Sequence, residues 1–203
     1  MIELMNSSPF FKSFRLVCLT LGMAILSTAQ AQTKPAVTGG GKCPAVLQHT
    51  VDRLQDEKPQ NLCQYAGQVV LVVNTASFCG FTPQYKNLEE LHARYKDKGL
   101  VVLGFPSNDF SQEPGNNQKI ADFCENTYGV KFPMFSKTTV RGADASPLFK
   151  QLTQLTDTAP KWNFYKYLIS RDGKQVKSFN STTDPLQASF LAEVDKQLNA
   201  KTP

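Results

Sequence analysis

Apolar runs that alternate with amphipathic stretches set the pattern in the middle of this chain. Five of the seven residues in 69–75 are Val or Leu, which predicts a short strand buried on both faces. In residues 83–98 the apolar side chains recur at spacings of three and four, the pattern of one helical face, and Gly99 follows. Residues 100–106 are again almost continuously apolar. This order predicts two parallel strands joined by a helix through a right-handed crossover.

The pattern after the second strand predicts three more helices and one hairpin. Amphipathic spacing favours helices at 116–128 and 145–155, and Asp184-Pro185 is typical of the cap and first residue of a last helix. Residues 165–170 and 175–179 are expected to pair across a turn. The elements together predict an α/β protein with a thioredoxin-like fold, in which helices flank a central mixed sheet and an N-terminal β-hairpin comes first.

Two cysteines bracket this predicted N-terminal hairpin. The hairpin is expected within residues 43–67, with residues 56–59 (DEKP) as its turn. If the two arms pair, Cys43 and Cys63 come close enough to bridge. We therefore expect a structural disulfide between them.

Cys79 lies on the tight turn between the first strand and the first helix. Thr82-Pro83 is typical of an N-cap followed by proline at the first helical position. A thiol ahead of such a helix faces free backbone N–H groups and the positive end of the helix dipole, and both favour the thiolate. The same edge of the sheet is where catalytic groups of α/β proteins gather. The pattern predicts a cysteine nucleophile, and the other interpretation is an inert core cysteine.

The N-terminus has the pattern of a secretory signal peptide. Lys12 and Arg15 precede an apolar run at 16–26, and Ala29 and Ala31 then form an A-x-A arrangement. The run is shorter than the roughly 20 residues that a membrane-spanning helix needs, so we expect cleavage after Ala31 rather than stable membrane insertion. The chain then divides into three expected parts: a signal peptide at 1–31, a flexible lead-in at 32–42 and one domain at 43–203. Export to the periplasm of a bacterium would place the cysteines in an oxidising compartment.

Charge and composition exclude several classes of function. The 22 basic and 17 acidic residues are interspersed without a basic block, so the net charge of +5 gives no reason to expect nucleic-acid binding. The only histidines, His49 and His92, are not at ligand spacing with a cysteine or an acid. We expect neither a metal site nor a cofactor.

Four motifs stand out from residue 54 onward, and in chain order they are NTASFCGFTPQY, GFPSNDFSQEPG, DFCENTYGVKFPMFSK and KWNFYKYLISRDGK. Together they resemble the glutathione peroxidase family, in its cysteine-dependent, thioredoxin-recycled bacterial branch. The resemblance implies a peroxidase of hydrogen peroxide and organic hydroperoxides, with Cys79 as the reacting residue and Gln112, Trp162 and Asn163 as its partners. The chemistry is consistent with these roles, because amide and indole N–H groups can hold a thiolate and the two peroxide oxygens in line without adding a competing negative charge.

Cys124 stands where the thioredoxin-recycled members of that family carry a resolving cysteine. The resemblance implies that the Cys79 thiolate reduces a peroxide and becomes a sulfenic acid, with which Cys124 condenses to a disulfide. A thioredoxin-like protein or glutathione would then restore both thiols. The other interpretation is that Cys124 is a core residue of its helix.

Three departures from the family pattern affect these expectations. Ser107 and Asp109 stand where many relatives have Cys and Gln, so no reactive thiol is expected there. The same loop is one residue shorter than usual ahead of Gln112, which bears on where the Gln112 amide lies. The segment 155–162 is short and resembles the members that lack the subunit-contact loop of tetrameric animal enzymes. We therefore expect a monomer.

Two other classes of function stay open at this point. A thiol–disulfide oxidoreductase of the same fold would normally carry a C-x-x-C pair, whereas Cys79 is followed by Gly80-Phe81-Thr82. A redox sensor would pass its oxidation to a partner protein instead of turning over. A steady-state peroxide assay with thioredoxin or glutathione as the reductant separates the three classes.

Overall fold

A four-stranded mixed sheet forms the centre of the computed structural model, which describes residues 42–200. The predicted signal peptide, and the predicted lead-in except for Lys42, lie outside the described residues. The sheet has the order β4-β3-β5-β6, with β3 parallel to β4 and the other neighbours antiparallel. The strand bounds are β3 Val69–Thr75, β4 Leu100–Pro106, β5 Lys166–Ile169 and β6 Val176–Phe179. The mixed sheet and the parallel β3–β4 pair are as the sequence predicted.

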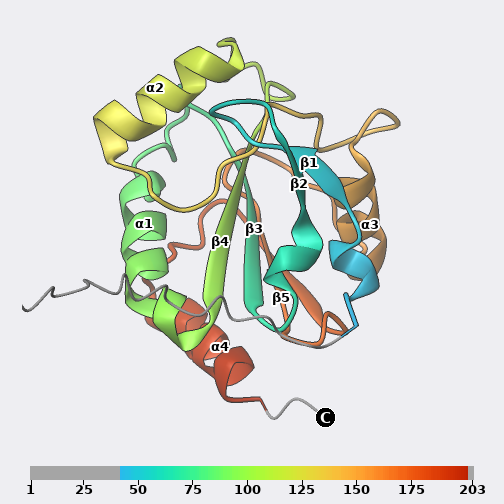
Figure 1. The fold of residues 1–203 in the computed structure, drawn as a ribbon. Coiled ribbons are helices and arrows are strands. Elements are labelled where there is room, and N and C mark those ends of the chain that lie inside the picture. The colour runs from blue at the N-terminus through green and yellow to red at the C-terminus, as the bar shows by residue number, and fades with distance from the viewer. Residues whose placement is uncertain (1–41, 201–203) are drawn as a thin grey trace, which may run out of the picture. The chain divides into compact units, whose positions relative to one another are not determined.

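Helices cover both faces of the sheet (Figure 1). Their bounds are α1 Gln84–Tyr95, α2 Asn117–Tyr128, α3 Pro147–Thr156 and α4 Ala188–Asn199, and a short 3-10 helix, η3 Lys96–Lys98, extends α1. Because side chains alternate along a strand, Leu71 and Val73 pack in one core with α1, α2 and α4, whereas Val70 and Val72 pack in a second core with α3. Both β3 and β4 are buried along their whole length, which explains their continuous apolar sequences.

At two helix starts the predicted side-chain cap is not used. α1 begins at Gln84, and the Thr82 hydroxyl does not cap it, because that oxygen accepts a hydrogen bond from the Cys79 backbone N–H at 2.9 Å. α4 begins at Ala188, not at Asp184-Pro185. Asp184 instead closes a turn ahead of the helix, where its side chain accepts from the Leu186 N–H at 2.8 Å. Thr82 and Asp184 each accept a hydrogen bond within the turn that precedes the helix, so neither side chain caps the helix itself.

The N-terminal part of the described chain is a short antiparallel hairpin flanked by two 3-10 helices. Its bounds are β1 Thr50–Asp52 and β2 Pro59–Asn61, with η1 Ala45–Leu47 before it and η2 Leu62–Tyr65 after it. Cys43 and Cys63 form a disulfide across this unit, with their Cα atoms 5.3 Å apart. The bond ties the start of the domain to the segment that leads into β3.

We expect removal of this disulfide to lower the free energy of unfolding by about 3 kcal/mol, because it closes a loop with a sequence separation of 20 residues. The variant to test carries both Cys43→Ser and Cys63→Ser, which avoids leaving one thiol free to mispair. Denaturant unfolding of the oxidised wild type and the double variant measures the difference. Equal stabilities, or an intact mass that shows both residues as free thiols after export, would contradict the expectation.

None of the helices in residues 42–200 has the length and apolar character needed to cross a membrane.

Candidate active site

Cys79 lies on the turn that joins β3 to α1, and only 8 % of the residue is exposed. The Thr82 hydroxyl shapes this turn, since it accepts from the Cys79 N–H and donates to the Ala76 carbonyl at 3.0 Å. The Phe81 backbone N–H donates to Cys79 Sγ at 3.4 Å. The thiol therefore has a backbone donor of the kind that the turn predicted, and such a donor favours the thiolate.

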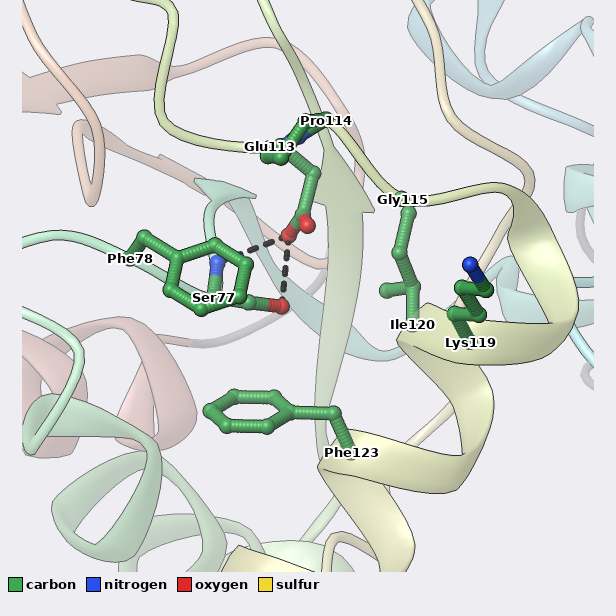
Figure 2. A pocket seen from close by; sticks show the side chains of 8 residues that line it. All are labelled: Ser77, Phe78, Glu113, Pro114, Gly115, Lys119, Ile120 and Phe123. Atoms are coloured by element: carbon green, nitrogen blue, oxygen red, sulfur yellow. Dashed lines mark hydrogen bonds between the residues drawn. The ribbon is translucent and has the colours of Figure 1, made fainter.

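The loop after β4 holds the two residues that precede Cys79. The Phe78 N–H donates to the Gln112 carbonyl at 3.1 Å. The Ser77 N–H and hydroxyl donate to the same carboxylate oxygen of Glu113, Oε2, at 2.7 and 2.9 Å (Figure 2). Gln112 and Glu113 thus fix the backbone of the Cys79 turn relative to the loop that contains them.

Glu113 was missed by the sequence analysis, although it follows Gln112 directly. It is 1 % exposed, and its own N–H donates to Asn108 Oδ1 at 2.9 Å. Burial raises the pKa of the Glu113 carboxyl, and the two hydrogen bonds from Ser77 partly oppose this shift. An acid within a Pro-Gly loop at the reactive edge of the sheet is the signal that could have identified it.

Asn163, which is 51 residues from Gln112 in the sequence, contacts the same loop. Its Nδ2 donates to Gln112 Oε1 at 2.9 Å, and the residue is fully buried. Gln112 therefore contacts the Cys79 turn through its backbone and Asn163 through its side chain. This contact supports the expectation that the side-chain amides of Gln112 and Asn163 lie at one site.

Asn74, near the end of β3, positions the segment that carries Trp162 and Asn163. Its Nδ2 donates to the Trp162 carbonyl at 3.1 Å, and its Oδ1 accepts from the Tyr165 N–H at 2.9 Å. The Trp162 ring is 41 % exposed and packs against Phe110, with the ring centroids 5.3 Å apart. Trp162 thus lies against the 107–112 loop, where its ring contact is with Phe110 and not with Gln112.

The departures from the family pattern have structural roles here. Asp109 Oδ2 accepts from the backbone N–H groups of Val140 and Arg141 at 2.7 and 3.1 Å, so the carboxylate fixes a neighbouring loop. Ser107 is fully buried. Ser111, directly before Gln112, takes a left-handed conformation with φ of 58°.

Cys124 lies on the buried face of α2 and is 3 % exposed. Burial raises the pKa of its thiol to about 11, although the nearby Tyr85 hydroxyl acts in the opposite direction. Cys79 and Cys124 are both free thiols, which is the reduced state of the pair.

A buried lysine supports the segment that carries Asn163, and the sequence analysis missed it as well. Lys166 is fully buried at the start of β5, and its Nζ donates to the Phe164 carbonyl at 2.8 Å. Burial lowers the pKa of Lys166 to about 7, and the negative charge of Asp184 partly opposes this shift. A lysine inside an otherwise apolar strand was the available signal.

The sequence of residues 47–153 matches the profile of the family described as "Glutathione peroxidase". The chain belongs to the glutathione peroxidase family. It is 50 % identical over 139 residues to a "Glutathione peroxidase-like peroxiredoxin GPX5" of Chlamydomonas reinhardtii, a match that covers 66 % of this chain and 85 % of that protein. The family identifies the chain as a thiol-dependent peroxidase, so its substrate is a peroxide and its reductant a thiol.

Solved structures agree with this assignment. One solved structure, described as "Crystal structure of Trgpx in apo form", is 37 % identical and has a TM-score of 0.63, and the match covers 80 % of this chain and 100 % of that chain. A thioredoxin family protein from Chlorobium tepidum, a thiol:disulfide interchange protein, has a TM-score of 0.60 at 14 % identity and covers 78 % of this chain and 99 % of its own. The second likeness concerns the fold alone and confirms the predicted thioredoxin-like architecture.

Proposed function

We propose that Cys79 is the nucleophile of this peroxidase and that Gln112, Trp162 and Asn163 assist it. The observation that carries the proposal is the position of Gln112, which bonds the residue before Cys79 through its backbone and Asn163 through its side chain. Amide and indole N–H groups can donate to the thiolate and to the peroxide oxygens. Donors held in place by a packed backbone stabilise the charge that moves from sulfur to oxygen.

The first step of the proposed reaction breaks the O–O bond of the hydroperoxide. The Cys79 thiolate attacks one oxygen of ROOH, and the leaving alkoxide takes a proton to become ROH, or water when the substrate is hydrogen peroxide. The sulfur is oxidised to a sulfenic acid as the peroxide is reduced. In the second step the Cys124 thiolate displaces hydroxide from this sulfenic acid, giving water and a Cys79–Cys124 disulfide.

The burial of Cys124 implies that α2 moves between these two steps. A thiol with a pKa of about 11 is almost wholly protonated at neutral pH and is a poor nucleophile. Local unwinding of α2 would expose the thiol and return its pKa towards the ordinary range. Gly129, which ends α2 in a left-handed conformation with φ of 62°, is a natural hinge for this motion.

We further propose a thioredoxin-like protein or glutathione as the reductant, a monomeric enzyme, and export to the periplasm after cleavage behind Ala31. The resolving cysteine favours a dithiol protein, and the Cys43–Cys63 disulfide suits an oxidising compartment. N-terminal sequencing of exported protein, with Gln32 expected first, tests the location. Light scattering of the purified enzyme tests the monomer.

Replacing Cys124 by serine tests the cycle. We expect Cys124→Ser to leave the first reaction with peroxide intact and to stop turnover supported by thioredoxin, because the sulfenic acid would no longer be resolved. Ala121→Ser places a hydroxyl on the same buried face of α2 and serves as the matched control. The assay is run with thioredoxin and with glutathione, and peptide mapping of the oxidised wild type should find the Cys79–Cys124 disulfide.

Three results would count against this cycle. If Cys124→Ser kept full thioredoxin-supported turnover, Cys124 would be a core residue and not the resolving cysteine. Oxidation of Cys79 without any turnover would favour the redox sensor. Disulfide exchange without peroxide reduction would favour the thiol–disulfide oxidoreductase.

A further inference from the structure

Lys166 places an amino group inside the sheet, where the fold would accept an apolar side chain. It is the first residue of β5, a strand that is buried along its whole length, and Lys166 itself is fully buried. Its partners in the neighbouring strands are Val73 of β3 and Phe179 of β6. Removing an amino group from water costs free energy that an apolar side chain of the same size would not cost. Packing alone therefore does not explain a lysine at this position.

The amino group bonds the backbone two residues earlier in the chain. Lys166 Nζ donates to the Phe164 carbonyl oxygen at 2.8 Å. The Phe164 N–H donates in turn to the Asn74 carbonyl oxygen at 2.6 Å. Lys166 and Asn74 thus occupy both polar groups of the Phe164 backbone.

Phe164 has a backbone conformation that residues other than glycine rarely adopt. Its φ is 60°, in the left-handed region, where a bulky side chain is strained. Such strain persists only where the surrounding contacts hold it. The Phe164 ring is fully buried and meets the Tyr85 ring edge-on, with the centroids 5.3 Å apart. The packed ring and the two backbone hydrogen bonds together hold the strained turn.

This turn fixes where the Asn163 side chain lies. Asn163 immediately precedes Phe164, and its Nδ2 donates to Gln112 Oε1 at 2.9 Å. That hydrogen bond uses the oxygen of the Gln112 amide, so the Gln112 Nε2 is the end left to donate to the reacting groups. The other end of the Asn163 amide, Oδ1, is buried and has no hydrogen-bond partner among the described residues. The backbone at Phe164 therefore determines whether Asn163 meets Gln112.

We propose that Lys166 is a positioning residue for peroxide reduction, which holds the Phe164 turn so that the Asn163 amide orients Gln112. The inference rests on the proposed role of Asn163. Lys166 acts in it through the backbone and needs no contact with the peroxide. Without the amino group, the buried Phe164 carbonyl would lose its donor, and the strained turn could relax. A small displacement of Asn163 would then slow a reaction that depends on aligned donors.

The test is a double-mutant cycle on the single-turnover oxidation of the reduced protein by hydrogen peroxide. Lys166→Met nearly keeps the side-chain volume but removes the donor, and it should lower the rate constant by about ten-fold. In the Asn163→Ala background the same substitution should lower the rate constant by less than about two-fold, because the residue through which Lys166 acts is already gone. Lys177→Met, which removes an exposed lysine from β6, is the matched control and should leave the rate constant unchanged.

A lysine that only supports the fold would give a different result. Its loss would slow the reaction by the same factor with and without Asn163. That outcome, or the wild-type rate constant in a folded Lys166→Met variant, would overturn the inference. Failure of the proposed function is distinct, because it would appear as Asn163→Ala alone reacting at the wild-type rate.

A second measurement observes the two amides directly. In a proton–nitrogen correlation spectrum of the reduced protein, the side-chain NH2 signals of Asn163 and Gln112 are identified by their loss from Asn163→Ala and Gln112→Ala. Both sets of signals should shift in Lys166→Met and stay in place in Lys177→Met. Signals that do not move in Lys166→Met would overturn the inference, whatever the activity of the variant.

Discussion

Replacing Cys79 by serine is expected to lower the rate of peroxide reduction on the order of 10³-fold or more, because a serine hydroxyl at neutral pH is a far weaker nucleophile than a thiolate. The only other free thiol in residues 42–200 is Cys124. That thiol cannot take over the reaction in the folded protein, since it is 3 % exposed and its pKa is raised to about 11. The rate of hydrogen peroxide consumption by the reduced protein measures the effect.

The comparison is informative only if the variant keeps its fold. The Cys43–Cys63 disulfide should be intact and the unfolding midpoint close to that of the wild type, because serine is similar to cysteine in size. Cys124→Ser, tested in the same single turnover, provides the matched control for loss of one free thiol. Wild-type rates in Cys79→Ser would remove the assignment of the nucleophile.

Replacing Lys166 by methionine is expected to change how stability depends on pH. In the unfolded chain a lysine titrates near 10.5, whereas burial lowers the pKa of Lys166 to about 7 in the folded protein. Between these two values the unfolded chain holds a proton that the folded protein does not. Lys166 therefore makes the free energy of unfolding rise with pH across this window, by up to about 1.4 kcal/mol per pH unit. Below about pH 7 both states are protonated, and the contribution is at its lowest.

Denaturant unfolding of wild type and Lys166→Met at pH 7, 8 and 9 tests this prediction. The stability of the wild type relative to the variant should increase steadily over the series, since other titrating groups cancel in the difference. Methionine also leaves the Phe164 carbonyl without its donor, but that loss is the same at every pH. Lys177→Met removes an exposed lysine that pairs with Glu193 and should show no such trend. Parallel curves for wild type and Lys166→Met would show that Lys166 keeps its charge when buried.

The strands and helices were predictable because their signals are local. The continuous apolar runs of β3 and β4 follow from burial on both faces, and the spacing of apolar residues in α1 and α2 follows from helical geometry. The two wrong cap predictions come from polar side chains that had two possible partners. Thr82 and Asp184 could each cap a helix or bond within the preceding turn. Which of these two hydrogen bonds forms depends on the fold around the residue.

The candidate site was predictable only in part, because its contacts join segments that are distant in the sequence. The position of Cys79 on a strand-to-helix turn could be read directly from the sequence, and the roles of Gln112 and Asn163 came from a family resemblance. The contact of Glu113 with Ser77 spans 36 residues, and that of Asn74 with Trp162 spans 88. No spacing rule predicts such pairs, because they depend on which strand ends meet at one edge of the sheet.

The position of Trp162 has a practical consequence for observing this protein. It is the only tryptophan in the chain, it adjoins Asn163, and its ring is partly exposed against Phe110. Tryptophan emission of this protein therefore originates from the single segment that also carries Asn163 and is not an average over the fold. The chain carries its own optical probe there, and any change in its emission on addition of peroxide can be recorded in real time without an attached label.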